Sequence, residues 1–271
     1  MDTRDFTRLL DRFSLSAEGY RKVRKGVQKR IVRHMQELRC PAMKDYLARI
    51  DADRDAEAEA RRLMDVSISR FFRDEPLWRA LEAEVIPLLI AEYPTGLRVW
   101  SAGCALGQEA YSIAILRALL SEKTPAMPPL EVWATDVNPA YLERAREGVY
   151  PAAALSRLSA EARARFFGPA GKKSFRVVDD LREGIHWQVQ DLTADYPPAR
   201  GFHLVFLRNS LLTYYRKEIV EVALLAVGDS LKPGGFLVIG RKERLPAFLK
   251  GFDTHPAVPC LCRKRGKSIS G

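Results

Sequence analysis

Two acidic residues beside a glycine-containing turn are the residues of this chain best suited to chemistry. The stretch RVWSAGCALGQEAYS has strand-like apolar residues, then Gly103 and Gly107, then the start of an apolar helix that carries Glu109. The next strand-like stretch ends in Asp136. An acid at the end of a strand can accept hydrogen bonds from both hydroxyls of a ribose, and Glu109 suits a cationic ligand. A ribose joined to a cation describes S-adenosylmethionine, with S-adenosylhomocysteine as the product of methyl transfer.

Other cofactor motifs are missing from the sequence, which narrows the choice of ligand. There is no Gly-Lys-Ser/Thr of a nucleoside-triphosphate loop, and the glycines read G-x-x-x-G instead of the dinucleotide pattern G-x-G-x-x-G. The charge of Glu109 would also oppose a pyrophosphate. On these features alone, an ordinary strand-turn-helix with two solvated acids stays an alternative.

The elements that must position these residues alternate between strand and helix from Leu97 onward. This alternation predicts a doubly wound, Rossmann-like α/β sheet, in which the turns at the carboxyl ends of the strands hold the ligand. The expected strands are Leu97–Ser101, Glu131–Thr135, His203–Arg208 and Phe236–Gly240, and the expected helices are Gln108–Leu120, Pro139–Arg146 and Arg216–Leu231.

The N-terminal part of the chain is expected to be helical and carries a basic run between Arg21 and Arg39. Apolar residues recur within it at helical spacing, so one face packs and the other is basic. The basic face is either simply solvated or a docking surface for an anionic partner, through Lys22, Lys25, Lys29 and Arg33. It has no interleaved exposed aromatic residues, which argues against nucleic acid. An acidic protein is the partner that we expect.

The composition of the chain indicates a globular protein that does not insert into a membrane. The 271 residues are 47% hydrophobic and carry a formal net charge of +10. No apolar run reaches the roughly 20 residues that cross a bilayer, and the first residues do not resemble a signal segment. We therefore expect a cytoplasmic protein without membrane insertion. The four cysteines lack metal-site spacing, so reduced thiols and no metal are expected.

Five segments together resemble one family. RVWSAGCALGQEAYS, ATDVN, SRFFRD, VFLRN and LKPGGFLVIG, in this spacing, are similar to the CheR-type chemotaxis-receptor (protein-glutamate) O-methyltransferases. The resemblance covers nearly the whole chain. It implies a helical N-terminal domain over residues 1–90 and a class I methyltransferase domain over residues 91–271. It also implies a small β-subdomain, expected at residues 174–190, which in some relatives docks a receptor tail by strand addition.

The resemblance also implies roles for individual residues. Asp136 would hold the ribose, Glu109 the methionine end of the cofactor, and Asp191 with Leu192 the adenine. Arg73 matches the arginine that the family places beside the transferred methyl group. Ser67 and Ser69 stand where the family usually has asparagine and threonine. The full set of expected cofactor-binding residues is Ser67, Ser69, Arg73, Gly103, Glu109, Asp136, Asp191, Leu192, Leu207, Arg208 and Asn209.

One departure from the family concerns the acceptor side of the pocket. Family members usually carry a tyrosine four residues after Asn209, where this chain has Thr213, followed by Tyr214 and Tyr215. A shift of one residue on a helix turns a side chain by roughly 100°, so Tyr214 replaces that tyrosine only if the local backbone differs. The catalytic candidates are therefore Arg73, Thr213 and Tyr214.

Three functions are compatible with these residues. The first is glutamate O-methylation on an acidic protein such as a chemotaxis receptor. A glutamate has a reference pKa of about 4.3 and is already an anion at neutral pH, so it needs no general base. The second is the same chemistry on a changed acceptor, namely another protein side chain, a small molecule or a nucleic acid, which Thr213 favours. The third is a sensor of S-adenosylmethionine without catalysis, against which Glu109, Asp136 and Arg73 argue.

Overall fold

A computed structural model describes residues 1–67, 69–124 and 127–266, which form two compact units. The first, which we call the helical unit, comprises Met1–Ser67 and Ser210–Val220. The second, the sheet unit, comprises Ile68–Asn209 and Glu221–Gly271. This division groups residues 69–90 with the sheet, whereas the sequence-based boundary groups them with the helices. The boundary at residue 90 stays a prediction.

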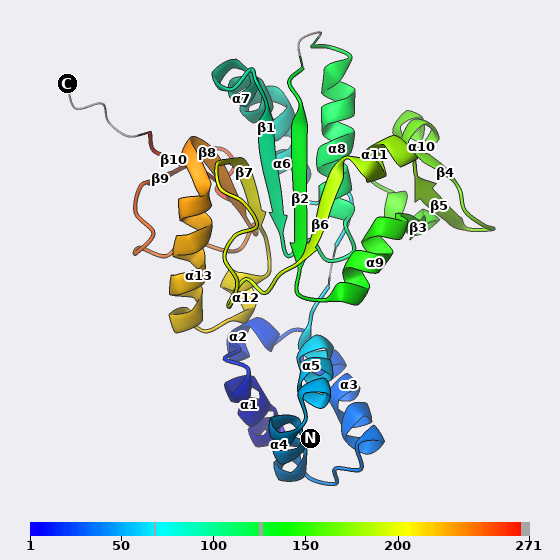
Figure 1. Ribbon diagram of the computed structural model, residues 1–271, viewed down its shortest axis with the longest axis vertical. Helices are drawn as coiled ribbons and strands as arrows, with labels where there is room; N and C mark the ends of the chain where they lie inside the picture. Colours follow the sequence, from blue (N-terminus) through cyan, green and yellow to red (C-terminus); the bar gives the residue numbers. More distant parts are fainter. Residues whose placement is uncertain (68, 125–126, 267–271) are drawn as a thin grey trace. The chain divides into compact units, whose positions relative to one another are not determined.

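The sheet unit is built on a seven-stranded sheet with the order β6-β2-β1-β7-β8-β10-β9 (Figure 1). Five neighbouring strands run parallel, and β10 is antiparallel to both β8 and β9. The doubly wound fold expected from the sequence is thus confirmed. The strands are β1 Leu97–Ala102, β2 Leu130–Asp136, β6 Ile185–Val189, β7 Phe202–Leu207, β8 Leu231–Ile239, β9 Phe252–Thr254 and β10 Leu261–Lys264.

The strand order reverses at β1, which pairs with β2 on one side and with β7 on the other. Ligands of open α/β sheets bind beyond the carboxyl ends of the strands at such a reversal. All six residues of β7 are buried, as expected for a strand covered on both faces. The sequence therefore places its glycine turn, which follows β1, at the position where this fold binds ligands.

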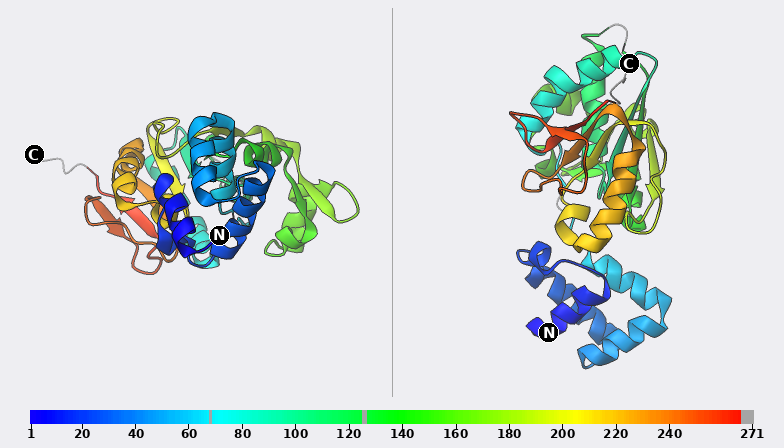
Figure 2. Two further views of the ribbon diagram at one scale, coloured as in Figure 1. Left: turned by 90° about the horizontal axis from the view of Figure 1, so that it is seen from below. Right: turned by 90° about the vertical axis from the view of Figure 1, so that its left-hand side faces the viewer.

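The helices of the sheet unit connect its strands and cover the sheet (Figure 2). One of them contains a π-helical turn, which joins α6 to α7. The segments are α6 Glu75–Ala80, π-helix Leu81–Val85, α7 Ile86–Glu92, α8 Gln108–Ser121, α9 Pro139–Glu147, 3₁₀-helix Ala152–Leu155, α10 Ala160–Phe166, α11 Asp179–Glu183 and α13 Lys217–Ser230, of which the first turn belongs to the helical unit.

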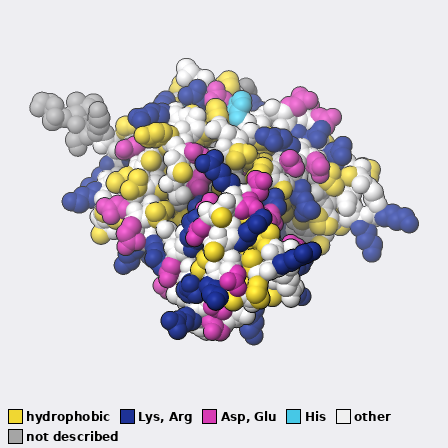
Figure 3. Space-filling model, turned by 60° about the horizontal axis from the view of Figure 1, so that its bottom comes forward, with side chains coloured by type: hydrophobic (Ala, Val, Ile, Leu, Met, Phe, Trp, Pro, Cys, Tyr) yellow, Lys and Arg dark blue, Asp and Glu magenta, His cyan; other side chains and the backbone are white. Residues whose placement is uncertain are grey.

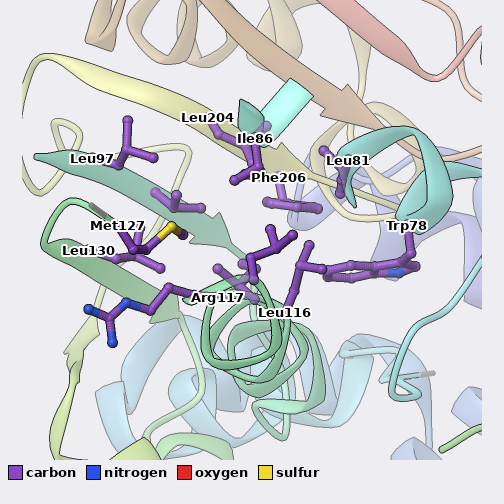
Figure 4. A pocket seen from close by; sticks show the side chains of 13 residues that line it. Trp78, Leu81, Ile86, Leu97, Leu116, Arg117, Met127, Leu130, Leu204 and Phe206 are labelled. Carbon is purple, nitrogen blue, oxygen red and sulfur yellow. The ribbon is translucent and has the colours of Figure 1, made fainter. Parts of the chain in front are cut away.

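A small cavity of about 20 Å³ lies between α8, the α6–α7 segment and the sheet. Figure 4 shows Leu97, Leu204 and Phe206 of the sheet facing Trp78 and Leu116 of the helices around it. Apolar cavities of this size stay dry and hold no polar ligand. The cavity is a gap in core packing and not a candidate for the cofactor site.

A second, three-stranded sheet has the order β3-β5-β4 and stands beyond β6 and α9 (Figures 1 and 2). Its strands are β3 Val149–Pro151, β4 Phe167–Pro169 and β5 Ser174–Val177. The insertion expected at residues 174–190 is therefore displaced toward the N-terminus. Only β5 falls in that range, because Ile185–Val189 pairs with β2 and forms the edge of the main sheet.

The helical unit packs short helices around its own core. Phe6, Tyr20, Ile31 and Tyr46 are among its buried side chains. Asp53 caps α5 by accepting the N–H groups of the first helical turn. The helices are α1 Thr3–Arg12, α2 Ala17–Tyr20, α3 Arg24–Glu37, α4 Met43–Ala52, α5 Arg54–Met64 and α12 Leu211–Tyr214. Across the described residues of both units, the helices are too short or too polar to traverse a bilayer.

Candidate functional site

The turn after β1 approaches its neighbours closely through left-handed backbone. Gly103, Ala105 and Gly107 have φ values of 78°, 50° and 84°. A Cβ atom on Gly107 would lie 2.8 Å from the ring of Trp187 on β6 and 2.9 Å from Cβ of Ala145 on α9. Glycine is therefore required there for space as well as for conformation. The turn leads directly into α8, whose first N–H groups have no partners within the helix.

Asp136 ends β2 and is joined to this turn. Its Oδ2 accepts the backbone N–H of Ala105 at 2.8 Å, and its Oδ1 accepts that of Asn138 at 3.0 Å. Burial raises the pKa of Asp136, and these N–H donors oppose the rise. A carboxylate has about four lone pairs, so Asp136 keeps acceptor capacity for further donors. A buried, fixed acceptor beside a glycine turn fits a ribose.

Glu109 in the first turn of α8 is already paired. Ser101 Oγ donates to its Oε1 at 2.7 Å, and Arg208 Nη1 donates to its Oε2 at 3.1 Å. Arg208 directly follows β7, and its side chain is only 4% exposed. It also forms an ion pair with Asp74, so two carboxylates share one guanidinium. The three groups carry a net charge of −1, which favours a cationic ligand.

The segment from Phe71 to Asp74 is a strained turn rather than part of a helix. Phe72 and Asp74 have φ values of 46° and 66°, so both neighbours of Arg73 are in the left-handed region. Phe71 is fully buried and packs edge-on against Tyr150. Left-handed conformations of non-glycine residues cost roughly 1–3 kcal/mol and persist where the surroundings enforce them. The core contact of Phe71 holds this turn in place.

Arg73 is held through both its backbone and its side chain. Its carbonyl accepts hydrogen bonds from Trp78 Nε1 at 2.8 Å and from Arg208 Nη2 at 3.4 Å. Its Nη2 donates to Oδ1 of Asn209 at 3.4 Å. Asn209 in turn donates its backbone N–H to Glu243, which lies after β8. Arg73, Arg208 and Asn209, which are far apart in the sequence, are thereby brought together.

The loop after β6 lies at the carboxyl ends of the strands, next to the turn that follows β2. Gln190 donates its backbone N–H to the carbonyl of Asp136 at 3.0 Å, and its side chain donates to the carbonyl of Tyr196 at 2.8 Å. Oδ1 of Asp191 accepts both the backbone N–H and the hydroxyl of Thr193. Asp191 therefore shapes the loop, and Leu192 is half-buried within it.

The expected site residues fall into two groups. One network of hydrogen bonds joins Glu109, Arg208, Arg73 and Asn209, whereas Asp136 is bonded to Ala105 in the turn that contains Gly103. Leu207 is the buried last residue of β7. Ser69 lies in the same unit, half-buried before the Phe71 turn. Ser67, Thr213 and Tyr214 belong to the helical unit. The assignment of all the residues in both groups to a cofactor or acceptor site stays a prediction.

Within the helical unit, the Thr213–Tyr215 segment packs closely on α2. The carbonyl oxygen of Thr213 would lie 2.0 Å from a Cβ atom on Gly19, so glycine permits this approach. The ring of Tyr214 lies edge-on to that of Tyr20, with centroids 5.2 Å apart. Tyr215 forms a β-bridge with Leu15. The Tyr214 side chain thus contributes to packing inside this unit.

Four residues that sequence reasoning did not single out complete the site. Ser101, Asp74 and Glu243 bind the side chains or backbone of expected site residues, and Ser112 Oγ accepts the backbone N–H of Phe72 at 3.0 Å. Asp74 and Ser101 lie inside the segments already quoted, beside the residues that were noticed. Nothing in the sequence near Glu243 indicates its contact.

The basic face of α3 is confirmed as a surface feature. Lys22, Lys25, Lys29 and Arg33 are all exposed. Lys22 lies in the turn before α3, whereas Lys25, Lys29 and Arg33 follow one another at four-residue spacing along the helix. Like charges at this spacing destabilise an isolated helix, and Arg33 also pairs with Glu37 at 3.7 Å. Arg30 differs, because it donates to the carbonyls at the end of α5. Figure 3 shows Lys and Arg side chains spread among acidic ones over the face that it displays.

Comparisons with known proteins agree on one family. The family model described as CheR methyltransferase, SAM binding domain, matches residues 67–258. A chemotaxis protein methyltransferase of Listeria innocua is 35% identical over 183 residues, covering 68% of this chain and 67% of that protein. One from Vibrio parahaemolyticus is 30% identical over 231 residues, covering 84% and 83%.

Two further matches are less informative about function. An uncharacterized 104.1 kDa protein of Rhodobacter capsulatus is 35% identical over 242 residues, covering 88% of this chain but only 25% of that protein. Among solved structures, a TehB-like SAM-dependent methyltransferase from Corynebacterium glutamicum is 18% identical with a TM-score of 0.38, covering 71% of this chain and 96% of that one. The family of this chain is therefore shown by the family model and by the two chemotaxis relatives.

Proposed function

Because the chain belongs to the CheR methyltransferase family and is therefore an S-adenosylmethionine-dependent methyltransferase, we propose that it methylates glutamate side chains on an acidic protein. The Listeria and Vibrio relatives are chemotaxis protein methyltransferases, so a chemotaxis receptor is the partner that we propose. The observation that carries the proposal is the position of Arg73, an arginine fixed by a strained turn at the edge of the sheet where the fold binds ligands.

The proposed cofactor site is made by residues of the sheet unit. Asp136 would accept the ribose hydroxyls, and the cluster of Glu109, Arg208 and Asp74 would face the cationic methionine end. The cofactor supplies a methyl group on a positively charged sulfur. Both the fixed acceptor of Asp136 and the net negative charge of the cluster fit such a molecule.

The acceptor needs alignment and not activation. A glutamate is ionised at neutral pH, so attack on the methyl group requires no general base. The contribution of the protein is to align the carboxylate oxygen with the methyl carbon and sulfur and to exclude water. Arg73 would orient the carboxylate. The guanidinium of Arg73 also donates a hydrogen bond to Asn209, so it would not pair fully with the carboxylate of the acceptor. The carboxylate would then keep its nucleophilicity.

The basic face of α3 supports an acidic partner. Lys25, Lys29 and Arg33 place like charges at successive turns of one face, and Glu37 offsets part of this charge by pairing with Arg33. An anionic surface would relieve the remaining repulsion. An acidic helix of a receptor has this property.

The proposal is tested by labelling extracts of the native cells with radioactive S-adenosylmethionine and the purified protein. Glutamate methylation predicts a labelled protein that releases volatile methanol under mild alkali, because methyl esters hydrolyse readily. The Arg73→Ala variant should transfer much less label. A label that resists alkali, or one found only in small molecules or nucleic acid, would refute glutamate as the acceptor.

A changed acceptor is a second candidate, favoured by Thr213 at the usual tyrosine position. Threonine is smaller than tyrosine and lacks its phenol, so an acceptor side chain other than glutamate could use the space.

A further inference from the structure

The loop after β8 contains Glu243, whose carboxylate contacts the candidate site. Glu243 lies in the segment Gly240–Arg244, and its Oε2 accepts two backbone N–H groups, from Gly240 and from Asn209. Asn209 follows β7, the strand next to β8. A single carboxylate oxygen thus ties the ends of two neighbouring strands together. Hydrogen bonds from N–H groups to a carboxylate are charge-assisted and stronger than neutral ones.

The bond to Asn209 supports an uncommon backbone conformation. Asn209 has a φ of 52°, in the left-handed region, which residues other than glycine seldom adopt and which asparagine tolerates better than most. Its side-chain Oδ1 accepts the hydrogen bond from Nη2 of Arg73. The direction of the Asn209 side chain, and hence the partner of Arg73, depends on this backbone conformation.

Gly240 provides independent support, because it makes room for the same contact. A Cβ atom on Gly240 would lie 2.7 Å from Oε2 of Glu243 and 3.0 Å from both Cγ and Oδ1 of Asn209. Real Cβ atoms essentially never come as close as 2.7 Å to another atom, so a side chain at this position would displace the carboxylate of Glu243. Since the φ of Gly240 is not in the left-handed region, alanine here would act through space and not through conformation.

We propose that Glu243 is a positioning residue for methyl transfer, acting on Arg73 through Asn209. It fixes the backbone of Asn209, whose side chain then holds the guanidinium of Arg73 toward the acceptor. The inference rests on the proposed role of Arg73 in transfer.

The test measures Glu243→Ala, Glu243→Gln and Gly240→Ala against Lys242→Ala, a matched control in the same loop whose side chain is exposed. Glu243→Ala and Gly240→Ala should each lower kcat about tenfold or more, while the Kd for S-adenosylhomocysteine, measured by calorimetry, stays within about twofold. Glu243→Gln should recover most of kcat, because its amide oxygen still accepts both N–H groups.

A double-mutant cycle then separates positioning from general damage. In an Asn209→Gly background, glycine adopts the left-handed conformation unaided and has no side chain to position. Adding Glu243→Ala there should change kcat by less than about twofold. A full tenfold loss in that background, or a Glu243→Ala enzyme indistinguishable from Lys242→Ala, would overturn the proposal.

Amide hydrogen exchange gives a readout that does not need catalysis. Glu243→Ala should speed exchange at the amides of Gly240 and Asn209, and Lys242→Ala should not. If the wild type methylates no carboxylate, the proposed function fails, whereas unchanged exchange at these two amides would overturn the role of Glu243 by itself.

Discussion

Asp136 is the residue on which we expect cofactor binding to depend most. Its carboxylate is buried and already accepts two backbone N–H groups, so it is fixed before any ligand arrives. Replacing Asp136 with alanine should weaken binding of S-adenosylhomocysteine by roughly ten- to more than a hundredfold, since a charged hydrogen-bond acceptor contributes about 1.5–3 kcal/mol. Titration calorimetry measures the loss. Equal affinity in the variant would remove Asp136 from the site.

The same residue gives binding a pH dependence. Burial raises the pKa of Asp136, whereas ribose hydroxyls would donate to its ionised form and lower that pKa. Affinity should therefore fall as the pH drops through the raised pKa and level off above it. The Asp136→Ala variant should lack this dependence.

Some site residues could be predicted from the sequence, but their partners could not. Asp136 and Glu109 were identifiable because an acid after a strand and an acid opening a helix are local patterns. The pairing of Glu109 with Arg208 was not identifiable, because 99 residues separate the two in the chain. Only folding brings such partners together, and the same holds for Glu243 and Asn209.

Helix α3 provides the surface that we assign to the partner. Reversing Lys25, Lys29 and Arg33 to glutamate should lower the rate of protein methylation at least tenfold, because the new surface repels an acidic helix. Affinity for S-adenosylhomocysteine should not change. The matched control reverses Arg4, Arg8 and Lys44, which are also exposed in the helical unit and give the same change in net charge.

Equal losses in the α3 variant and in its control would mean that net charge and not a docking face matters. Strongly salt-dependent binding of RNA or DNA by the wild type, abolished by the α3 changes alone, would identify nucleic acid as the anion.

Helix α12 carries the departure from the family. Thr213→Tyr restores the usual residue and should raise transfer to an acidic receptor helix if that is the true acceptor. It should instead block transfer if the native acceptor occupies the space beside Thr213. Because the ring of Tyr214 already packs on Tyr20, we expect Tyr214→Phe to leave acceptor choice unchanged. An altered acceptor in Tyr214→Phe, with none in Thr213→Tyr, would contradict this assignment.

Most elements could be predicted from the sequence, because strand and helix periods are local signals. The expected helix Gln108–Leu120 and strand Glu131–Thr135 differ from the observed ones by at most one residue at each end. The predicted β-insertion included Ile185–Val189 because this segment has the residue pattern of a strand. That pattern is the same whether the strand joins the small sheet or the main sheet. Which sheet it joins is decided by its pairing with β2.

The stability of the fold should depend on a buried histidine far from the carboxyl ends of the strands. His203 is 3% exposed, and its Nδ1 accepts the backbone N–H of Arg98 at 2.8 Å. Burial, with the nearby Lys232, lowers the pKa of His203 to about 4. The folded protein therefore disfavours the protonated imidazole.

The sign of the effect follows from this lowered pKa. The stabilising contribution is fully present above about pH 6.5, the ordinary histidine value, and is lost as the pH falls toward 4. The loss should reach up to about 3 kcal/mol of unfolding free energy. Urea denaturation of the wild type and of His203→Asn, which keeps an acceptor for Arg98 but does not titrate, measures it. Parallel pH profiles would exclude His203 as the cause.

The most direct test of glutamate methylation uses a purified receptor helix with a single methylatable glutamate and its glutamine counterpart. With labelled S-adenosylmethionine, this protein should place one label on the glutamate helix, release it as methanol in alkali, and leave the glutamine helix unlabelled. Equal labelling of both helices, or a label stable in alkali, would contradict the assignment of a carboxylate as the acceptor.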